Sequence, residues 1–163
     1  MTAAARDGIR LPGGTVPAAW VDYNGHMNIG YYAIAFDQAL DRLLEDHLGM
    51  GEAYTRETGH GPFVLQSAGC YLGEQREGEA FDFSARLLDS DAKRVHLFLR
   101  MHRIDDGEVL ATSEQLVMNV DLAARRGTPY PEPARARIAA ICAEQATLPR
   151  PELAGSPLGI RRR

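Results

Sequence analysis

Hydrophobic and polar positions repeat with two different periods along this chain, and each period predicts a different kind of element. Between residues 29 and 48, polar side chains recur in pairs that lie four positions apart. This spacing puts them on one solvated stripe of an α-helix, whereas the remaining, unusually wide face is apolar. The polar residues are Asp37, Gln38, Asp41, Arg42, Glu45 and Asp46. Asn28 is a suitable N-cap and Gly49 a suitable C-terminal residue, so the pattern predicts one long helix that a concave surface must cover.

Four later segments have the pattern of β-strands. They are residues 63–72, 81–88, 95–102 and 109–122. In the second and third of them apolar and polar residues alternate, which is the two-residue period of a half-buried strand. Gly107 lies in a short polar turn between the last two segments and can supply the positive φ of a hairpin. We therefore predict four consecutive antiparallel strands in a meander.

The two ends of the chain have weaker patterns. Residues 1–14 contain few side chains that could pack and end in Pro-Gly-Gly, so we expect a flexible N-terminal arm. Residues 15–21 are predicted as a first strand, and residues 132–145 as a second helix. Residues 146–163 form a Pro- and Arg-rich tail. The expected architecture is one α+β domain over 15–145, with a single curved sheet wrapped around the long helix.

Composition narrows the class of protein without assigning a function. The chain has 163 residues, 45% hydrophobic and 25% charged, as is typical of a globular domain. Its net charge of −4 argues against nucleic-acid binding, which usually needs a basic surplus. Cys70 and Cys142 lack metal-ligand spacing, so we expect reduced thiols, a cytoplasmic location, and neither a metal nor a cofactor. No apolar stretch reaches the ~18 residues of a membrane span.

Candidate chemistry is concentrated just before the long helix, in the segment from Trp20 to Asn28. A helix N-terminus presents unpaired N–H groups that can polarise a carbonyl. Asp22 lies upstream across a turn formed by Asn24-Gly25, and the apolar helix face can line a pocket. Together these features predict acyl transfer or hydrolysis, in which the carboxylate attacks a carbonyl carbon or activates water.

Two other interpretations of the same segment were weighed. In the first, Asp22 and Asn28 are caps, Asn24-Gly25 is an ordinary turn, and His26 is a hydrogen-bonded turn residue. In the second, the segment is a calcium loop, but an EF-hand requires Gly at its sixth position and Glu at its twelfth. Gly25 is fourth here and Ala33 is twelfth, which excludes that loop.

The order of strand, Asp-x-x-Gly-His-x-Asn loop, long helix and four strands resembles the hotdog-fold acyl-CoA thioesterases of the 4-hydroxybenzoyl-CoA thioesterase-like group, over residues 16–121. The run from Trp20 to Asn28, the Tyr31-Tyr32 pair and the segment from Asp91 to His96 are similar to thioesterases linked to carnitine breakdown, which act on betainyl-CoA. The resemblance implies a hotdog fold, with a five-stranded antiparallel sheet wrapped around one long helix.

The resemblance also implies roles for individual residues. Asp22 takes the position of the catalytic carboxylate, as nucleophile or as general base. The backbone amides of His26, Met27 and Asn28 would polarise the thioester carbonyl. The acyl pocket would be lined by Trp20, Tyr23, Tyr32 and Phe36, and a subset of aromatic rings near the loop could form a cage for a quaternary ammonium. Lys93 and Arg94 are read either as a clamp for the phosphates of coenzyme A or as a solvated turn.

Members of this group are dimers with sites at the subunit interface, which implies a homodimer or a dimer of dimers. Residues 63–74 of a second copy would then complete each site. Gln66 and Ala68 stand where the carnitine-linked subgroup often carries an acid and a histidine, so the acyl specificity stays open. Betainyl-CoA is the expected substrate. The alternatives are a medium-chain or aromatic acyl-CoA, and a non-catalytic module that binds acyl-CoA.

Overall fold

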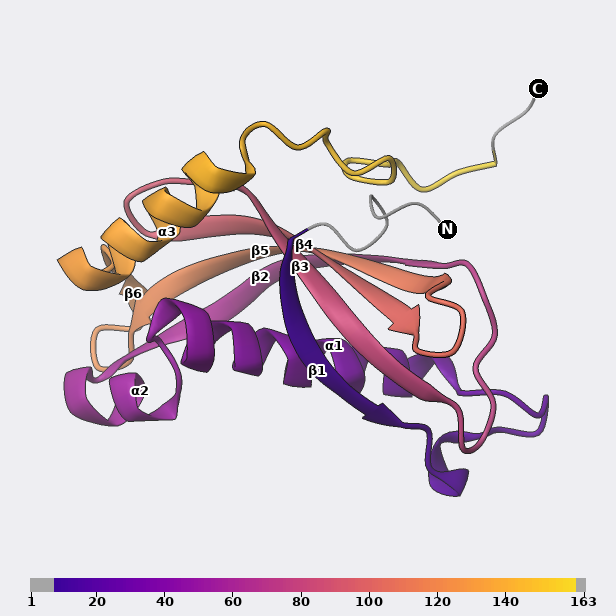
Figure 1. Cartoon of the computed structure of the whole chain (residues 1–163). Helices are drawn as coiled ribbons and strands as arrows, with labels where there is room; N and C mark the ends of the chain where they lie inside the picture. The colour runs from indigo at the N-terminus through magenta and orange to yellow at the C-terminus, as the bar shows by residue number, and fades with distance from the viewer. Residues whose placement is uncertain (1–7, 161–163) are drawn as a thin grey trace.

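A curved antiparallel sheet wraps around the long helix α1 in the computed structural model, which describes residues 8–160 (Figure 1). Five strands run in the order β1-β3-β4-β5-β2, and the two-residue strand β6 pairs with β5. Their bounds are β1 Ile9–Thr15, β2 His60–Tyr71, β3 Ala80–Ser90, β4 Arg94–Arg103, β5 Val109–Asp121 and β6 Arg126–Gly127. This arrangement confirms the predicted α+β hotdog fold.

The long helix was predicted closely. It comprises α1, Ile29–Leu43, and a π-helical turn, Leu44–Leu48. It ends at Gly49, whose φ of 67° lies in the left-handed region that favours glycine. The apolar face of the helix is buried against the concave face of the sheet, to which alternate residues of the central strands contribute. From the helix and its π-turn the buried residues are Tyr32, Ala35, Phe36, Ala39, Leu40, Leu43, Leu44 and Leu48.

The predicted meander of four consecutive strands is wrong in one pairing. Strands β3, β4 and β5 do follow one another in the sheet, but β2 pairs with β5 and not with β3. The chain between β2 and β3 therefore passes from the end of the sheet formed by β2 to the position of β3, beyond β5 and β4. The period of a strand shows which face is apolar, but it does not show which neighbour the strand pairs with.

The start of the chain also differs from expectation. Residues Ile9–Thr15, placed in a flexible arm, form β1 and pair with β3; the rest of that predicted arm, 1–7, lies outside the described residues. The strand predicted over 15–21 is absent, because Ala18–Trp20 is a short 3-10 turn. Glycine makes the β1 pairing possible, since a Cβ on Gly13 would lie 1.9 Å from the Phe81 carbonyl oxygen.

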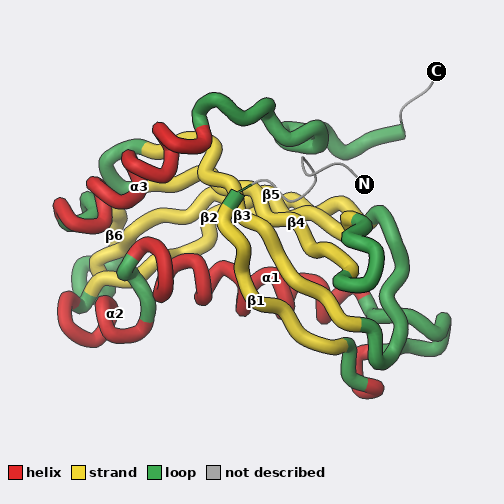
Figure 2. Tube along the Cα trace, viewed as in Figure 1, coloured by secondary structure: helices red, strands yellow, loops and turns green. Residues whose placement is uncertain are grey.

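Two further helices, α2 and α3, complete the fold (Figure 2). Helix α2, Glu52–Thr58, was not predicted, and glycines at positions 49, 51, 59 and 61 flank it on both sides. Helix α3, Glu132–Gln145, was predicted, and it lies across the face of the sheet opposite α1. The predicted tail, 146–163, begins after it, and its last residues, 161–163, lie outside the described residues. The start of the tail is held by hydrogen bonds from the buried Arg86 side chain to the carbonyls of Gln145, Leu148 and Pro149.

Candidate active site

The segment before α1 is a tight loop that returns the chain to its starting point. The Asp22 N–H donates to the His26 carbonyl at 3.1 Å, and the Gly25 N–H donates to the Asp22 carbonyl at 2.9 Å. Gly25 has a φ of 81°, as the turn requires. Residues Val21 and Met27 face each other in an isolated β-bridge. The loop thus fixes Asp22 beside the first turn of α1.

The carboxylate of Asp22 is held by two donors. The Asn24 N–H donates to Oδ1 at 2.8 Å, and the Asn28 side-chain amide donates to Oδ2 at 3.1 Å. The backbone hydrogen bond from Asn24 lowers the pKa of Asp22 most, and Asn28 and the nearby His26 lower it further. Because these contacts favour the charged form, Asp22 is an ionised carboxylate at neutral pH.

Asn28 is the N-cap of α1, as predicted, since its side-chain oxygen accepts from the Gly30 N–H at 3.0 Å. The predicted role of the backbone amides needs a correction. The Met27 N–H donates to the Gln75 carbonyl at 2.7 Å, and the Asn28 N–H donates to the Trp20 carbonyl at 2.8 Å. Both are therefore occupied and do not point to a ligand.

Two N–H groups at the start of α1 remain available. Within residues 8–160, the amides of His26 and Ile29 have no hydrogen-bond acceptor. His26 belonged to the predicted set, whereas Ile29 did not, because the sequence does not reveal which amides of a loop are already used. The Nδ1 of His26 lies 3.3 Å from the Met27 carbonyl oxygen, which makes Nδ1 the protonated ring nitrogen.

A cavity of about 310 Å³ opens at this end of the helix. His26 and Ile29 line it from the loop and the helix, and Tyr32 lines it one turn further on. Tyr32 donates to the Gly73 carbonyl at 3.3 Å, and its ring meets that of Tyr71 edge to face at 5.2 Å. Burial raises the pKa of the Tyr32 hydroxyl. The complete lining is His26, Met27, Ile29, Tyr32, Tyr71, Leu72, Gly73 and Glu74.

Only one of the four predicted acyl-pocket aromatics, Tyr32, lines this cavity. Tyr23 is 97% exposed at the tip of the loop. Phe36 is buried in the core against Phe83. Trp20 stacks on Tyr31 with ring centroids 5.2 Å apart and lines a different cavity beneath β1. A helical period brings residues to one face, but it does not show where along that face a cavity opens.

The wall of the cavity that faces α1 was not predicted to come from the same chain. The end of β2, Tyr71, and the three residues after it, Leu72, Gly73 and Glu74, line the cavity of their own chain, although residues 63–74 were expected to reach the site of a second copy. No pattern in the sequence indicates this, because the approach depends on the route of the connection between β2 and β3.

The two residues of the predicted coenzyme A clamp, Lys93 and Arg94, differ in whether their charge is already paired. Arg94 is committed to Asp91, to which its Nε donates at 2.7 Å. The hydrogen bond from Arg94 is the largest of the contacts that lower the pKa of Asp91 to about 2. Lys93 forms no ion pair with any residue that the structure describes. Lys93 is therefore the freer of the two cations.

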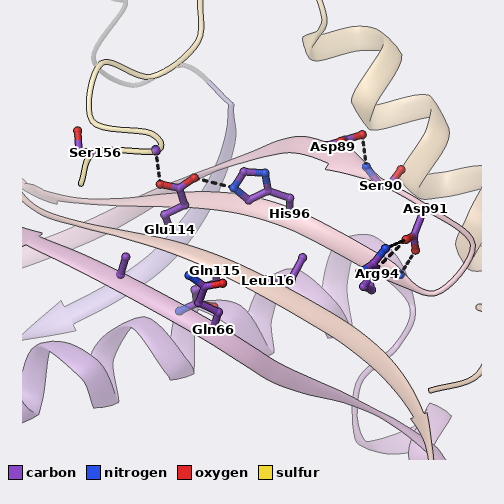
Figure 3. Close-up of a pocket in the computed structure, with 12 residues that line it drawn as sticks. Gln66, Asp89, Ser90, Asp91, Arg94, His96, Glu114, Gln115, Leu116 and Ser156 are labelled. Carbon is purple, nitrogen blue, oxygen red and sulfur yellow. Dashed lines mark hydrogen bonds and ion pairs between the residues drawn. The ribbon is translucent and has the colours of Figure 1, made fainter. Parts of the chain in front are cut away.

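Gln66 and Ala68 lie away from Asp22. They line a larger cavity, about 500 Å³, on the face of the sheet opposite α1 (Figure 3). There the His96 ring nitrogen Nε2 is 2.6 Å from a Glu114 carboxylate oxygen, and the other oxygen of Glu114 accepts from the Gly155 N–H at 2.6 Å. Within their own chain these two positions therefore lie on the outer face of the sheet.

Two other findings concern ligands and membranes. Among residues 8–160, no three His, Cys, Asp or Glu side chains lie close enough together to hold a metal ion. None of the helices in the same range has the length and apolar character needed to cross a membrane.

Comparison with known proteins identifies the family. The model of the thioesterase-like superfamily matches residues 16–138, which include the loop, α1 and the long strands from β2 to β5. The chain belongs to this superfamily. A betainyl-CoA thioesterase from Pseudomonas aeruginosa (PAO1) is 33% identical over 141 residues, with 86% of this chain and 88% of that protein covered.

A longer relative and a solved structure are also similar to this thioesterase-like chain. An L-carnitine dehydrogenase/betainyl-CoA thioesterase from Rhizobium meliloti (strain 1021) is 38% identical over 154 residues. These cover 94% of the thioesterase-like chain but only 31% of the relative, so the chain spans about a third of that protein's length. A Staphylococcus aureus protein solved in complex with CoA is similar with a TM-score of 0.86, 28% identity, and coverage of 94% and 97% of the two chains.

Proposed function

We propose that this chain hydrolyses an acyl-CoA thioester to a free acid and coenzyme A, with Asp22 as the catalytic carboxylate. One observation carries the proposal. An ionised carboxylate is hydrogen-bonded to Asn28, the N-cap of a long helix. The nearby residues His26 and Ile29 line a cavity of about 310 Å³, and their N–H groups have no acceptor within residues 8–160. The similarity to proteins named betainyl-CoA thioesterases supports it.

In the proposed reaction the thioester carbonyl oxygen accepts hydrogen bonds from the amides of Ile29 and His26. These donors and the positive end of the helix dipole stabilise the oxyanion of the tetrahedral intermediate. Asp22 attacks the carbonyl carbon, the C–S bond breaks and coenzyme A leaves as a thiolate; water then hydrolyses the acyl-aspartate. Alternatively, Asp22 takes a proton from a water molecule that attacks the same carbon.

Betainyl-CoA is the proposed substrate. The relatives support it, and the cavity has groups that suit a trimethylammonium ion. The rings of Tyr32 and Tyr71 line it, and the Glu74 carboxylate lies in the same wall. A well-placed aromatic ring contributes about 0.5–2 kcal/mol to the binding of such a cation. The apolar lining residues Met27 and Leu72 favour the second candidate, a medium-chain or aromatic acyl-CoA.

The test is a thiol-release assay with betainyl-, acetyl-, medium-chain and aromatic acyl-CoA. We expect betainyl-CoA to have the highest kcat/KM, and equal values for betainyl- and acetyl-CoA would remove it as the substrate. Asp22→Asn should lower kcat by roughly 10³-fold or more. Saturable binding of acyl-CoA by the unmodified chain without thiol release would contradict the proposed hydrolysis and would support a non-catalytic module that binds acyl-CoA.

Asp121→Asn is the matched control for Asp22→Asn. Asp121 also accepts backbone N–H bonds in a turn, from Ala123 and Ala124, and the same contacts lower its pKa. It lies at the end of β5, remote from the cavity beside α1. The control should keep full activity, whereas a fully active Asp22→Asn variant would refute the mechanism.

Coenzyme A binding is proposed to use Lys93 more than Arg94, because Asp91 already neutralises the guanidinium. Replacing Lys93 by Ala should raise KM roughly three- to tenfold without changing kcat, as loss of one phosphate contact does. An unchanged KM at low ionic strength would exclude this contact.

A homodimer through β2 is also proposed. This 12-residue strand is at the end of the sheet, so no strand among residues 8–160 pairs with its outer edge. It exposes Phe63, Val64 and Leu65 to 40–49%, and long exposed apolar edges readily pair with another strand. Leu65→Lys should shift the mass measured by light scattering from dimer to monomer. Ile104→Lys, at an equally exposed apolar residue outside β2, should leave the dimer intact.

A further inference from the structure

We infer that Asn28 is a positioning residue, which orients the Asp22 carboxylate through the end of its side chain that is not needed to cap the helix. The inference rests on the proposed function, because positioning matters only if Asp22 reacts. The sequence predicted an N-cap and a backbone donor at Asn28, and capping accounts for only one of the two contacts of its side chain.

The orientation of the Asn28 amide is fixed by its surroundings. Its Oδ1 accepts from the Gly30 N–H at 3.0 Å, and an amide nitrogen could not do so. The Nδ2 must then face Asp22, whose Oδ2 lies 3.1 Å away. Reversing the amide would put two N–H donors together at Gly30 and two oxygens together at Asp22.

The backbone of Asn28 is tied at both polar groups. Its N–H donates to the Trp20 carbonyl at 2.8 Å, and its carbonyl accepts from the Tyr31 N–H at 3.0 Å. The side chain is therefore attached to a fixed point, half-buried between the loop and the helix. A carboxylate bound to it is held in one place relative to α1.

Capping alone would not require asparagine at this position. Asp and Ser cap helices about as well as Asn, because a cap needs only a side-chain oxygen. Neither can replace the donor to Asp22: a Ser side chain is shorter, and an ionised Asp has no N–H. Asn28 is suited to both tasks because one end of its amide accepts and the other donates.

The consequence for the reaction is geometric. The next residue, Ile29, has one of the two N–H groups that find no acceptor within residues 8–160. Asn28 therefore joins the attacking carboxylate to the groups that polarise the carbonyl. The second donor, the Asn24 N–H on Oδ1, completes the orientation of the carboxylate plane. A misplacement of about 1 Å can cost on the order of 10²-fold in rate.

The experiment compares Asn28→Asp, Asn28→Ser and Asn28→Ala. Asn28→Ser keeps the cap and should nearly keep the melting temperature, whereas Asn28→Ala loses both contacts. Asn28→Asp also keeps the cap, but the two facing carboxylates should lower its melting temperature at neutral pH. We expect Asn28→Ser to lower kcat by roughly 10- to 100-fold with little change in KM, because the substrate's binding groups are untouched. In Asn28→Asp a second carboxylate faces Asp22, so the acid limb of the pH–kcat profile should move to higher pH.

A readout independent of turnover is the NMR titration of the Asp22 carboxyl carbon. Its pKa should rise in Asn28→Ser, because one donor to the charged form is lost, and rise more in Asn28→Asp. Wild-type kcat together with an unchanged Asp22 titration in the folded Asn28→Ser variant would overturn the inference. Absence of turnover in the unmodified chain would instead refute the proposed function, while the titration would still report whether Asn28 controls the carboxylate.

Discussion

Leu43 offers a direct test of how the long helix is held in the sheet. It lies in the last turn of α1, its side chain is completely buried, and it belongs to the core cluster shared by the helix and the strands. Replacing it by Ala removes three carbon groups from this contact. The substitution does not weaken the helix itself, because Ala has the highest helix propensity. Any loss of stability in Leu43→Ala therefore reports the packing of helix against sheet.

The expected magnitude has two parts. Removal of three buried carbon groups costs roughly 2.4 kcal/mol at about 0.8 kcal/mol each. The cavity left behind raises the total to roughly 3–5 kcal/mol when the surroundings relax only partly. For a domain of this length each kcal/mol lowers the melting temperature by about 2–4 °C, so the fall should be about 6–20 °C. The concave sheet limits relaxation around the helix, which favours the upper half of the range.

The assay is urea unfolding followed by circular dichroism, at two protein concentrations because unfolding of a dimer depends on concentration. Leu158→Ala is the matched control, since Leu158 is fully exposed and should change the free energy of unfolding by less than about 0.5 kcal/mol. A loss below about 1 kcal/mol for Leu43→Ala, with an unchanged slope against urea, would refute the packing described here.

Three further predictions concern β1, the β3–β4 turn and the C-terminal segment. Gly13→Ala should destabilise the protein by more than about 1 kcal/mol in the same urea assay, because the new Cβ would collide with the backbone of β3. Gly14→Ala is the control, since its Cβ would lie 3.6 Å from the nearest atom, and equal effects of the two variants would contradict the pairing of β1 with β3. The lowered pKa of Asp91 means that it stays ionised until the pH falls to about 2, and NMR titration of Arg94→Ala should show that pKa move up toward 3.8. An unmoved value would exclude the ion pair as its cause. Arg86→Met should raise hydrogen exchange in residues 146–156, because the three carbonyls of residues 145–149 lose their donor; unchanged exchange would show that other contacts hold the segment.

Local patterns were sufficient for several features of this protein. The 3.6-residue period, the cap at Asn28 and the stop at Gly49 predicted the long helix, because each depends on neighbours in the sequence. Alternation likewise predicted which residues of β3 and β4 face the core. The loop motif brought attention to Asp22 and, by resemblance, to the family that the comparison then confirmed.

Other features depended on contacts between distant segments. The pairing of β2 with β5, the use of residues 9–15 as a strand and the wall formed by residues 71–74 follow from the route of the chain through the sheet. The same holds for the amides beside Asp22. The Met27 N–H donates a hydrogen bond to the Gln75 carbonyl, which lies 48 positions further along the chain, and is therefore not available to a ligand.

The sequence by itself therefore predicted the long helix, the four long strands and the family, and it marked Asp22 as the candidate carboxylate. The tertiary structure decided which donors remain free, which aromatic rings reach the cavity and which strand has an open edge. The physical reason is that a side chain's type and period are local properties. Whether a hydrogen-bonding group is already satisfied depends on every segment that packs against it.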